Sequence, residues 1–325
     1  MLTMTSIRRL GGEFALINAI AKVTGKPKNK RVVVGIGDDA AVLAYDKKHY
    51  MLLTVDMLVE GDHFSQKWST PEQIGMKAME VNVSDIAAMG GLPEYALISI
   101  SLPEDVPVES VIRVYKGMNT VARKYNFDII GGNTTHGKNL IIDIIIAGFV
   151  EKDRLCLRSG AKIGDLVCVT GDLGKSAAGL ETLKAGFKGN VKPHLEPKCR
   201  LKEARMISLH ANAMIDVSDG LASEVGHICE RSNVGAEVFK EKIPISKNTL
   251  SLAKKVGKDP YDLALHGGED FELVFTIPEE KLENIKIACP ITIVGRIVDK
   301  KRGIYLVDKG RRMPPGSGYD HFKQE

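Results

Sequence analysis

The sequence lacks the features that mark disulfide-bonded, secreted and membrane proteins. Its 325 residues contain five cysteines, an odd number with no CxxC or other metal-ligand spacing, which is typical of reduced, mostly buried thiols in a cytosolic protein. The longest apolar run, residues 141–150, contains Asp143 and is far too short to span a bilayer. No signal-peptide pattern opens the chain, because Arg8, Arg9 and Glu13 interrupt it. We therefore expect a soluble, cytoplasmic protein without a membrane partner.

The chain also lacks a strong excess of charge of either sign. Its 45 Lys and Arg residues are nearly balanced by 41 Asp and Glu residues, which leaves a net charge of +4. The densest basic stretches, 26–31 and 300–302, contain no aromatic residue. Nucleic-acid binders concentrate positive charge in patches or stripes, whereas short charge runs are usually solvated surface. We expect no nucleic-acid partner.

Apolar periodicity and turn residues predict alternating strands and helices. In the first half these are strands at 32–34, 51–55, 128–130 and 140–150 and helices at 70–90 and 107–125. In the second half they are strands at 166–170, 213–217, 271–277 and 291–298 and helices at 175–185, 197–210 and 221–232. A turn-rich stretch at 158–164 separates the halves. We therefore predict an α/β protein of two domains, residues 1–152 and 153–325, each with its own core.

Two glycine-rich stretches only superficially resemble nucleotide motifs. In Gly35-Ile-Gly37-Asp38-Asp39-Ala40 two aspartates stand where a dinucleotide fingerprint would receive pyrophosphate. The second stretch, 171–176, has two residues between its glycines, whereas a P-loop needs four to wrap phosphates. Neither a nicotinamide site nor a P-loop is therefore expected.

Carboxylates recur at strand ends and on an apolar helix face. They are Asp38-Asp39, Asp56 after Thr54-Val55, Asp85, and Asp216 with Asp219. At 100° per residue Asp85 lies about 20° from Ile74, on the buried stripe of its helix. Turn and cap preferences explain the other acids one at a time, but a buried unpaired carboxylate is costly. Because Mg²⁺ prefers oxygen ligands and neutralises phosphates, the set predicts a Mg²⁺-dependent phosphotransferase that uses ATP.

Three further stretches suit phosphate or nucleotide binding. The glycine-rich segment 131–137 follows an apolar strand and offers close backbone approach and hydroxyl groups. Arg158 can form a fork with a phosphate. The stretch Gly267-Gly268-Glu269-Asp270 is either a tight turn with capping residues or part of the site, and the residues alone leave both open.

In this order and spacing the segments resemble the thiamine-monophosphate kinase family, of the superfamily that includes phosphoribosylaminoimidazole synthetase. The resemblance runs from Gly35 to about Phe322. The segments that carry it are 35–39 (Gly-Ile-Gly-Asp-Asp), 54–64 (Thr-Val-Asp-Met-Leu-Val-Glu-Gly-Asp-His-Phe), 81–90 (Val-Asn-Val-Ser-Asp-Ile-Ala-Ala-Met-Gly), 131–135 (Gly-Gly-Asn-Thr-Thr), 158–162 (Arg-Ser-Gly-Ala-Lys), 215–221 (Ile-Asp-Val-Ser-Asp-Gly-Leu) and 267–272 (Gly-Gly-Glu-Asp-Phe-Glu). It implies a synthetase-like fold with an N-terminal domain that dimerises through its sheet and a C-terminal α/β domain. It also implies transfer of the ATP γ-phosphate to thiamine monophosphate, which gives thiamine diphosphate.

The resemblance also implies roles for individual residues. It implies magnesium ligands at Asp39, Thr54, Asp56, Asp85, Asn133, Asp216 and Asp219, with Asp38 as a further candidate. It implies ATP contacts at Tyr115, Gly132, Asn133, Arg158 and Ser218, and thiamine contacts at His63, Glu269 and Tyr319. The family commonly has Gly-Gly-Asp-Thr where this chain has Asn133. Asparagine keeps one oxygen ligand but loses a charge, so a metal held there would be weaker or shifted.

The reaction implied by the resemblance needs no general base. The acceptor is a phosphate monoester whose second pKa is near 6, so it is already largely an oxyanion at neutral pH. Alignment and neutralisation by metal ions and Arg158 then suffice, and we expect direct in-line transfer. A selenophosphate synthetase would need a cysteine within residues 1–31, which have none. A phosphoribosylaminoimidazole synthetase-like enzyme and a Mg-ATP-binding regulator without turnover remain alternatives, and only Asn133 favours the regulator.

Overall fold

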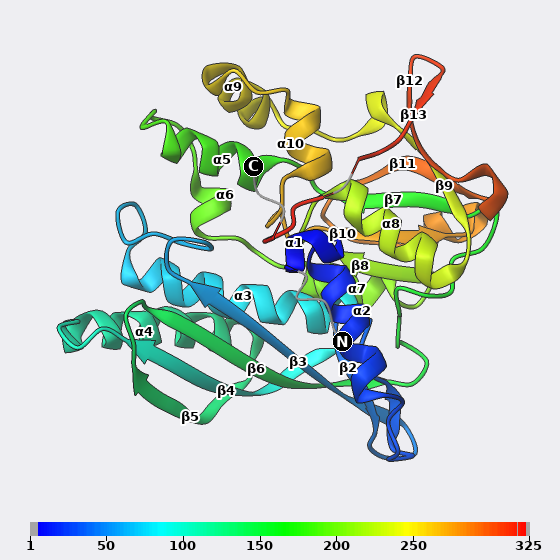
Figure 1. Ribbon diagram of the computed structural model, residues 1–325. Coiled ribbons are helices and arrows are strands. Elements are labelled where there is room, and N and C mark those ends of the chain that lie inside the picture. Colours follow the sequence, from blue (N-terminus) through cyan, green and yellow to red (C-terminus); the bar gives the residue numbers. More distant parts are fainter. Residues whose placement is uncertain (1–5, 317, 323–325) are drawn as a thin grey trace.

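Two β-sheets with helices between and around them form the protein (Figure 1). The computed structural model describes residues 6–316 and 318–322, so the first five residues of the stretch used to exclude a signal peptide lie outside it. The first sheet has six strands in the order β1 (Val32–Val34), β2 (Ala41–Ala44), β3 (His49–Val59), β6 (Ile141–Glu151), β4 (Leu92–Leu102) and β5 (Asp128–His136). Neighbouring strands in this sheet are antiparallel, except for β4 and β5, which are parallel to each other.

The second sheet and most of the remaining helices come from the second half of the chain. Its seven strands run in the order β13 (Arg311–Met313), β12 (Ile304–Asp308), β9 (Gly235–Phe239), β11 (Ile291–Val298), β7 (Leu166–Thr170), β10 (Leu273–Ile277) and β8 (Ala213–Asp216). The accompanying helices are α5 (Lys175–Lys184), α6 (Lys192–Leu195), α7 (Leu201–Ile207), α8 (Leu221–Ser232), α9 (Lys247–Val256) and α10 (Pro260–His266). Two N-terminal helices, α1 (Ile7–Leu10) and α2 (Glu13–Thr24), precede the first sheet. No helix among the described residues is long and apolar enough to cross a membrane.

Helices α3 (Pro71–Ala88) and α4 (Val108–Tyr125) cover one face of the first sheet. Helix α3 begins with a complete capping box, in which the Thr70 hydroxyl and the Gln73 side chain each accept a backbone N–H of the other residue, with Pro71 in the first turn. The two helices approach closely because Gly117 of α4 has no Cβ: one there would lie 2.0 Å from the Glu72 carbonyl oxygen. This tight packing fixes the position of α3, which carries several polar residues of the site.

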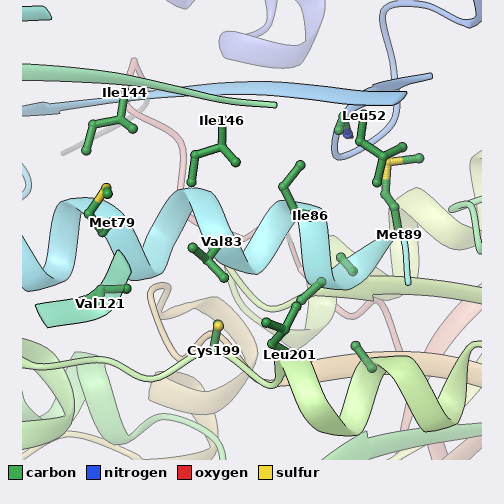
Figure 2. Packing of buried hydrophobic residues seen from close by; sticks show 14 of the residues in the cluster. Leu52, Met79, Val83, Ile86, Met89, Val121, Ile144, Ile146, Cys199 and Leu201 are labelled. Carbon is green, nitrogen blue, oxygen red and sulfur yellow. Dashed lines mark hydrogen bonds between the residues drawn. The ribbon is translucent and has the colours of Figure 1, made fainter. Parts of the chain in front are cut away.

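One hydrophobic core extends through both halves of the chain. Figure 2 shows α3 between Ile144 and Ile146 of β6 on one side and Cys199 and Leu201 of the second half on the other. The same cluster includes Phe275 of β10 in the second sheet, while a second cluster consists entirely of residues from the second half. The second half therefore has a core cluster of its own, while the core of the first half continues into the second. Because α3 is enclosed on opposite sides, its buried polar groups must find partners inside the protein.

The mixed α/β class, with one sheet in each half, is confirmed, but several predicted elements need correction. Strand β4 was not predicted, and residues 131–136 lie inside β5 rather than in a loop after it. The predicted helix 197–210 is reduced to α7, because the backbone N–H of Cys199 donates to Glu80 Oε2 over 3.0 Å and holds the preceding segment outside the helix. The predicted boundary after residue 152 falls between the last strand of the first sheet and the first strand of the second.

Candidate functional site

A cleft of about 1900 Å³ opens between the first sheet, α3, the start of α8 and the loop before β10. Drug-sized ligands usually occupy pockets of about 300–1000 Å³, so this cleft has room for two substrates. Val81 and Asp85 bring α3 to its wall, and α2 contributes Phe14 and Ile17. The predicted residues that line it are Asp38, Asp39, Thr54, Asp56, His63, Asp85, Arg158, Asp216, Ser218, Asp219, Glu269 and Tyr319.

Three carboxylates from three different elements meet at the base of the cleft. Asp39 follows β1, Asp85 lies on α3 and Asp216 ends β8, and one oxygen of each lies within 4.8 Å of the others. The Thr54 hydroxyl of β3 donates to Asp85 Oδ2 over 2.5 Å. The buried Oδ2 atom of Asp39 has no hydrogen-bond partner among the residues that the structure describes. A buried carboxylate oxygen with no donor is costly, so this geometry suits a cation.

The pKa values of these carboxyl groups are raised, mainly because burial disfavours their charged forms. Burial, followed by the charges of Asp56, Asp216 and Asp39, raises the pKa of Asp85 well above its ordinary value. Burial and the charge of Asp219 raise the pKa of Asp56 to about 7. A bound cation would reverse this penalty, because it favours the ionised form of each carboxyl group.

Arg158 lies against the cluster from the loop between β6 and β7. Its Nη2 and Nε atoms donate to Asp39 Oδ1 over 2.5 and 3.1 Å, and its backbone N–H donates to Asp38 Oδ1 over 3.2 Å. Burial opposes the charged guanidinium, but the Asp39 carboxylate outweighs it and raises the pKa of Arg158. The guanidinium thus remains charged beside the carboxylates, where it can also meet a phosphate.

Asp219 enters the cleft from the turn that joins β8 to α8. Its backbone N–H donates to Glu224 Oε1 over 2.8 Å, and Glu224 is only 1% exposed. Its carbonyl oxygen accepts the backbone N–H of Tyr319 over 3.0 Å. Burial and the charge of Glu13 raise the pKa of Asp219 to about 6. The turn is therefore held from both sides, by α8 and by the C-terminal segment.

The three residues expected near the acceptor also line the cleft, and the backbone N–H groups of Glu269 and Tyr319 donate to the turn that carries Ser218 and Asp219. His63 Nδ1 accepts the Val59 backbone N–H over 3.1 Å, and the Tyr319 hydroxyl donates to Asp62 Oδ1 over 3.2 Å. Glu269 forms an ion pair with Lys77 of α3, with Nζ 2.7 Å from Oε1. The Lys77 ammonium also donates to the His63 carbonyl oxygen over 2.7 Å. One buried lysine thus links two of these three residues.

Tyr115, Gly132 and Asn133 are placed elsewhere. None of them is among the described residues that line the cleft. Tyr115 lies on α4, and the other two lie on β5, the edge strand of the first sheet, which β4 and β6 separate from β3. One copy of the chain therefore does not bring these three residues to the carboxylates.

Sequence reasoning missed several polar residues that orient the predicted ones. Asn82 Oδ1 accepts the Asp56 backbone N–H over 3.0 Å, and the Ser84 hydroxyl donates to Asp216 Oδ2 over 2.6 Å. Lys77 and Glu224 act on Glu269 and on the Asp219 turn as described above. The available signal was helical phase, because polar residues at buried helix positions need partners.

Comparisons with known proteins give consistent results. Sequence models described as "AIR synthase related protein, N-terminal domain" and "AIR synthase related protein, C-terminal domain" match residues 37–150 and 162–308. A thiamine-monophosphate kinase of Aquifex aeolicus is 39% identical over 318 residues, covering 96% of this chain and 98% of that protein. One of Bacillus subtilis is 38% identical, covering 96% and 99%. The solved structure "AaThiL complexed with AMPPCP and TMP" superposes with a TM-score of 0.86 at 38% identity, covering 99% of this chain and all of that one.

Proposed function

Because the chain belongs to the thiamine-monophosphate kinase family of AIR synthase related proteins, we propose that it transfers the γ-phosphate of ATP to thiamine monophosphate, giving thiamine diphosphate and ADP. The solved relative is a complex with AMPPCP and TMP. The observation in this chain that carries the proposal is the carboxylate cluster with Arg158 in a cleft large enough for both substrates. We further propose that it acts in the cytoplasm, since its cysteines are free.

The cluster fits Mg²⁺. Among the described residues Asp39 Oδ2 is buried without a partner, and burial raises the pKa values of Asp56, Asp85 and Asp216, so the described groups leave the cluster short of positive charge even with Arg158 beside it. Carboxylate oxygens, a threonine hydroxyl and substrate phosphates are the ligands that Mg²⁺ prefers. We assign the metal to Asp39, Thr54, Asp56, Asp85, Asp216 and Asp219, with Asp38 beside them. When bound, the metal would neutralise charge on the two phosphorylated substrates.

The chain's own residues then need only to bind and align the substrates. Arg158, 18% exposed at its side chain, can turn one edge of its fork from Asp39 toward a phosphate. The turn around Ser218 and Asp219 is fixed by Glu224 and Tyr319, which keeps its groups in place during transfer. Because the acceptor phosphate is already ionised near neutral pH, no side chain has to remove a proton. Transfer is direct, without a phosphorylated side chain.

We also propose a homodimer that forms through the outer face of the first sheet. The inner face is buried, but apolar side chains on the outer face are exposed on four neighbouring strands: Val55 and Met57 of β3, Ile145 of β6, Leu97 of β4 and Ile130 of β5 are each at least 39% exposed. Contiguous exposed apolar surface marks an interaction site. Gly132, Asn133 and Tyr115, which do not line the cleft of their own chain, are then assigned to the ATP site of a partner.

The domain division stays a proposal as well, with residues 1–152 carrying the dimer face and most metal ligands, and 153–325 supplying Arg158, Ser218 and Glu269.

A synthetase of the same superfamily is the less favoured alternative, because full-length relatives of 38–39% identity are thiamine-monophosphate kinases. One assay decides between the readings. The protein is incubated with Mg²⁺, ATP and thiamine monophosphate, and thiamine diphosphate is measured. Bound ATP without product would support a regulator instead.

A further inference from the structure

Lys77 is a buried cation that the phosphoryl transfer does not use. The residue is 2% exposed, and its Nζ donates to Glu269 and to the carbonyl oxygen of His63 over 2.8 and 2.7 Å. Burying an ammonium group is costly unless it is paired and hydrogen-bonded. An apolar residue would fill the same place in α3 without this cost. The presence of a lysine here therefore indicates a function for its two partners, Glu269 and His63, which both line the cleft.

Lys77 lies on the same stripe of α3 as the metal-binding end of the cleft. Lys77, Val81 and Asp85 are spaced by four residues, so they share one face of the helix. At a rise of 1.5 Å per residue, Lys77 and Asp85 are about 12 Å apart along the axis. A substrate whose phosphate binds near Asp85 can therefore extend along the helix toward Lys77.

Glu269 is held in a strained loop that aims its carboxylate into the cleft. Its φ is +64° and that of Phe271 is +49°, values that non-glycine residues rarely adopt. The backbone N–H groups of both residues donate to the Ser218 and Val217 carbonyl oxygens over 2.8 and 2.9 Å. Such strain persists only where the surroundings enforce it, and it is concentrated at functional sites. Burial opposes ionisation of Glu269, but Lys77 together with the nearby His194 and His63 outweighs it and lowers the pKa, so the carboxylate is a fixed hydrogen-bond acceptor.

His63 is the complementary donor. Its Nδ1 accepts the Val59 backbone N–H, so in the neutral ring the proton lies on Nε2. Burial lowers the pKa of His63, which favours that neutral ring. The Lys77 ammonium holds the His63 backbone through its carbonyl oxygen. One lysine therefore sets the position of an acceptor and of a donor at the same end of the cleft.

We propose that Lys77 is a positioning residue that fixes Glu269 and His63 so that the cleft selects an aminopyrimidine edge on the acceptor. The exocyclic amine of such a ring would donate to Glu269, and the adjacent ring nitrogen would accept from His63 Nε2–H. This inference rests on the proposed function, in which thiamine monophosphate is the acceptor. Adenine presents the same edge, so ATP is the competing occupant that the experiment must separate.

Steady-state kinetics of the full-length protein test this assignment. Wild type, Lys77→Met, Glu269→Gln and the double variant are assayed with thiamine monophosphate and with the monophosphate of oxythiamine, in which oxygen replaces the amine. Losing an ionic hydrogen bond should raise KM for thiamine monophosphate about tenfold to a hundredfold, with kcat and KM for ATP changed less than about threefold. Glu269→Gln should also reduce the ratio of kcat/KM for thiamine monophosphate to kcat/KM for the oxythiamine substrate at least about tenfold. The reason is that the glutamine amide can donate to the oxygen that replaces the amine.

The double variant and a surface control make the outcome decisive. Both substitutions act on one contact, so the double variant should match Glu269→Gln in KM rather than add to it. Lys254→Met, at an exposed position of α9, should match wild type throughout. If Lys77→Met fails to fold, Glu269→Gln still decides, since wild-type KM and selectivity in that variant would overturn the inference. A change in KM for ATP alone would also overturn it. An inactive wild type would instead refute the proposed function.

Discussion

Replacing Asp216 with asparagine tests whether the carboxylate cluster exists for cations or for the fold. Asp216 is 2% exposed, and burial with the charge of Asp39 raises its pKa from 3.8 to about 7. At pH values between these two pKa values the folded state binds more protons than the unfolded state. Protonation of Asp216 therefore stabilises the folded state in acid, and this stabilisation is lost as pH rises through about 7. The difference between the two pKa values corresponds to roughly 4 kcal/mol in the free energy of unfolding.

At pH 8 without metal, Asp216→Asn should therefore raise the free energy of unfolding. We expect about 1–4 kcal/mol, because the neighbouring carboxylates share the repulsion and a proton on any of them relieves it. Asparagine can still accept the Ser84 hydroxyl, and its NH₂ group lies beside the Asp39 and Asp85 carboxylates, which can accept from it. At pH 5 the difference should shrink. With saturating Mg²⁺ and ATP the wild type should become more stable than Asp216→Asn, because only the wild type gains the full free energy of binding these ligands.

The assay is urea denaturation at both pH values, with and without Mg²⁺ and ATP, together with kcat for thiamine diphosphate formation. We expect kcat to fall at least about 100-fold. Asp165→Asn is the matched control: Asp165 is 4% exposed and accepts from Asn212 and from the Lys162 backbone. This control should lose about 1–3 kcal/mol and keep kcat. If Asp216→Asn also loses stability at pH 8 without metal, the cluster is structural and the reasoning is refuted.

Three further substitutions and one chelator treatment probe the same site and the dimer. Asp85→Asn should lower kcat at least about 100-fold with folding retained, since asparagine can still accept the Thr54 hydroxyl; equal losses of activity and stability would make Asp85 structural. Arg158→Ala should lower kcat by about 100- to 1000-fold and destabilise the metal-free protein, because Asp39 loses its partner, and Mg²⁺ should restore only the stability. EDTA should abolish product formation and added Mg²⁺ should restore it. Met57→Asp should convert a dimer into monomers in sedimentation with an unchanged circular dichroism spectrum; a sedimentation profile like that of the wild type would contradict the proposed interface.

The sequence predicted the part of the site that depends on local pattern. Helical phase placed Asp85 on the buried side of α3. Asp216 ends its strand as expected, whereas Asp56 lies inside β3, and all three acids line one cleft. Strand β4 was missed because Gly90-Gly91 and Pro93 indicate a loop, although its buried residues alternate beyond the bulge near Pro93. Register irregularities of this kind obscure the two-residue period on which strand prediction depends.

What the sequence could not supply is the partner of each buried polar group. Glu224 lies at the edge of the apolar stripe of α8, so its phase was visible, but its contact with the Asp219 backbone depends on the turn after β8. Asn133 shows the opposite case. Its motif suggests an ATP contact, yet the sheet order places it on an edge strand away from the cleft of its own chain. Contacts of this kind are set by topology and assembly, which local pattern does not encode.

Helix α3 carries polar groups of the site whose partners local sequence pattern does not predict. Lys77, Asn82, Ser84 and Asp85 would be exposed on an ordinary amphipathic helix, but here the first sheet and α7 enclose the helix from both sides. Each of the four has a partner that lines the cleft. A buried helix holds such groups more rigidly than a loop does. That rigidity is what alignment of two phosphates requires, and it ties the cost of burying these groups directly to catalysis.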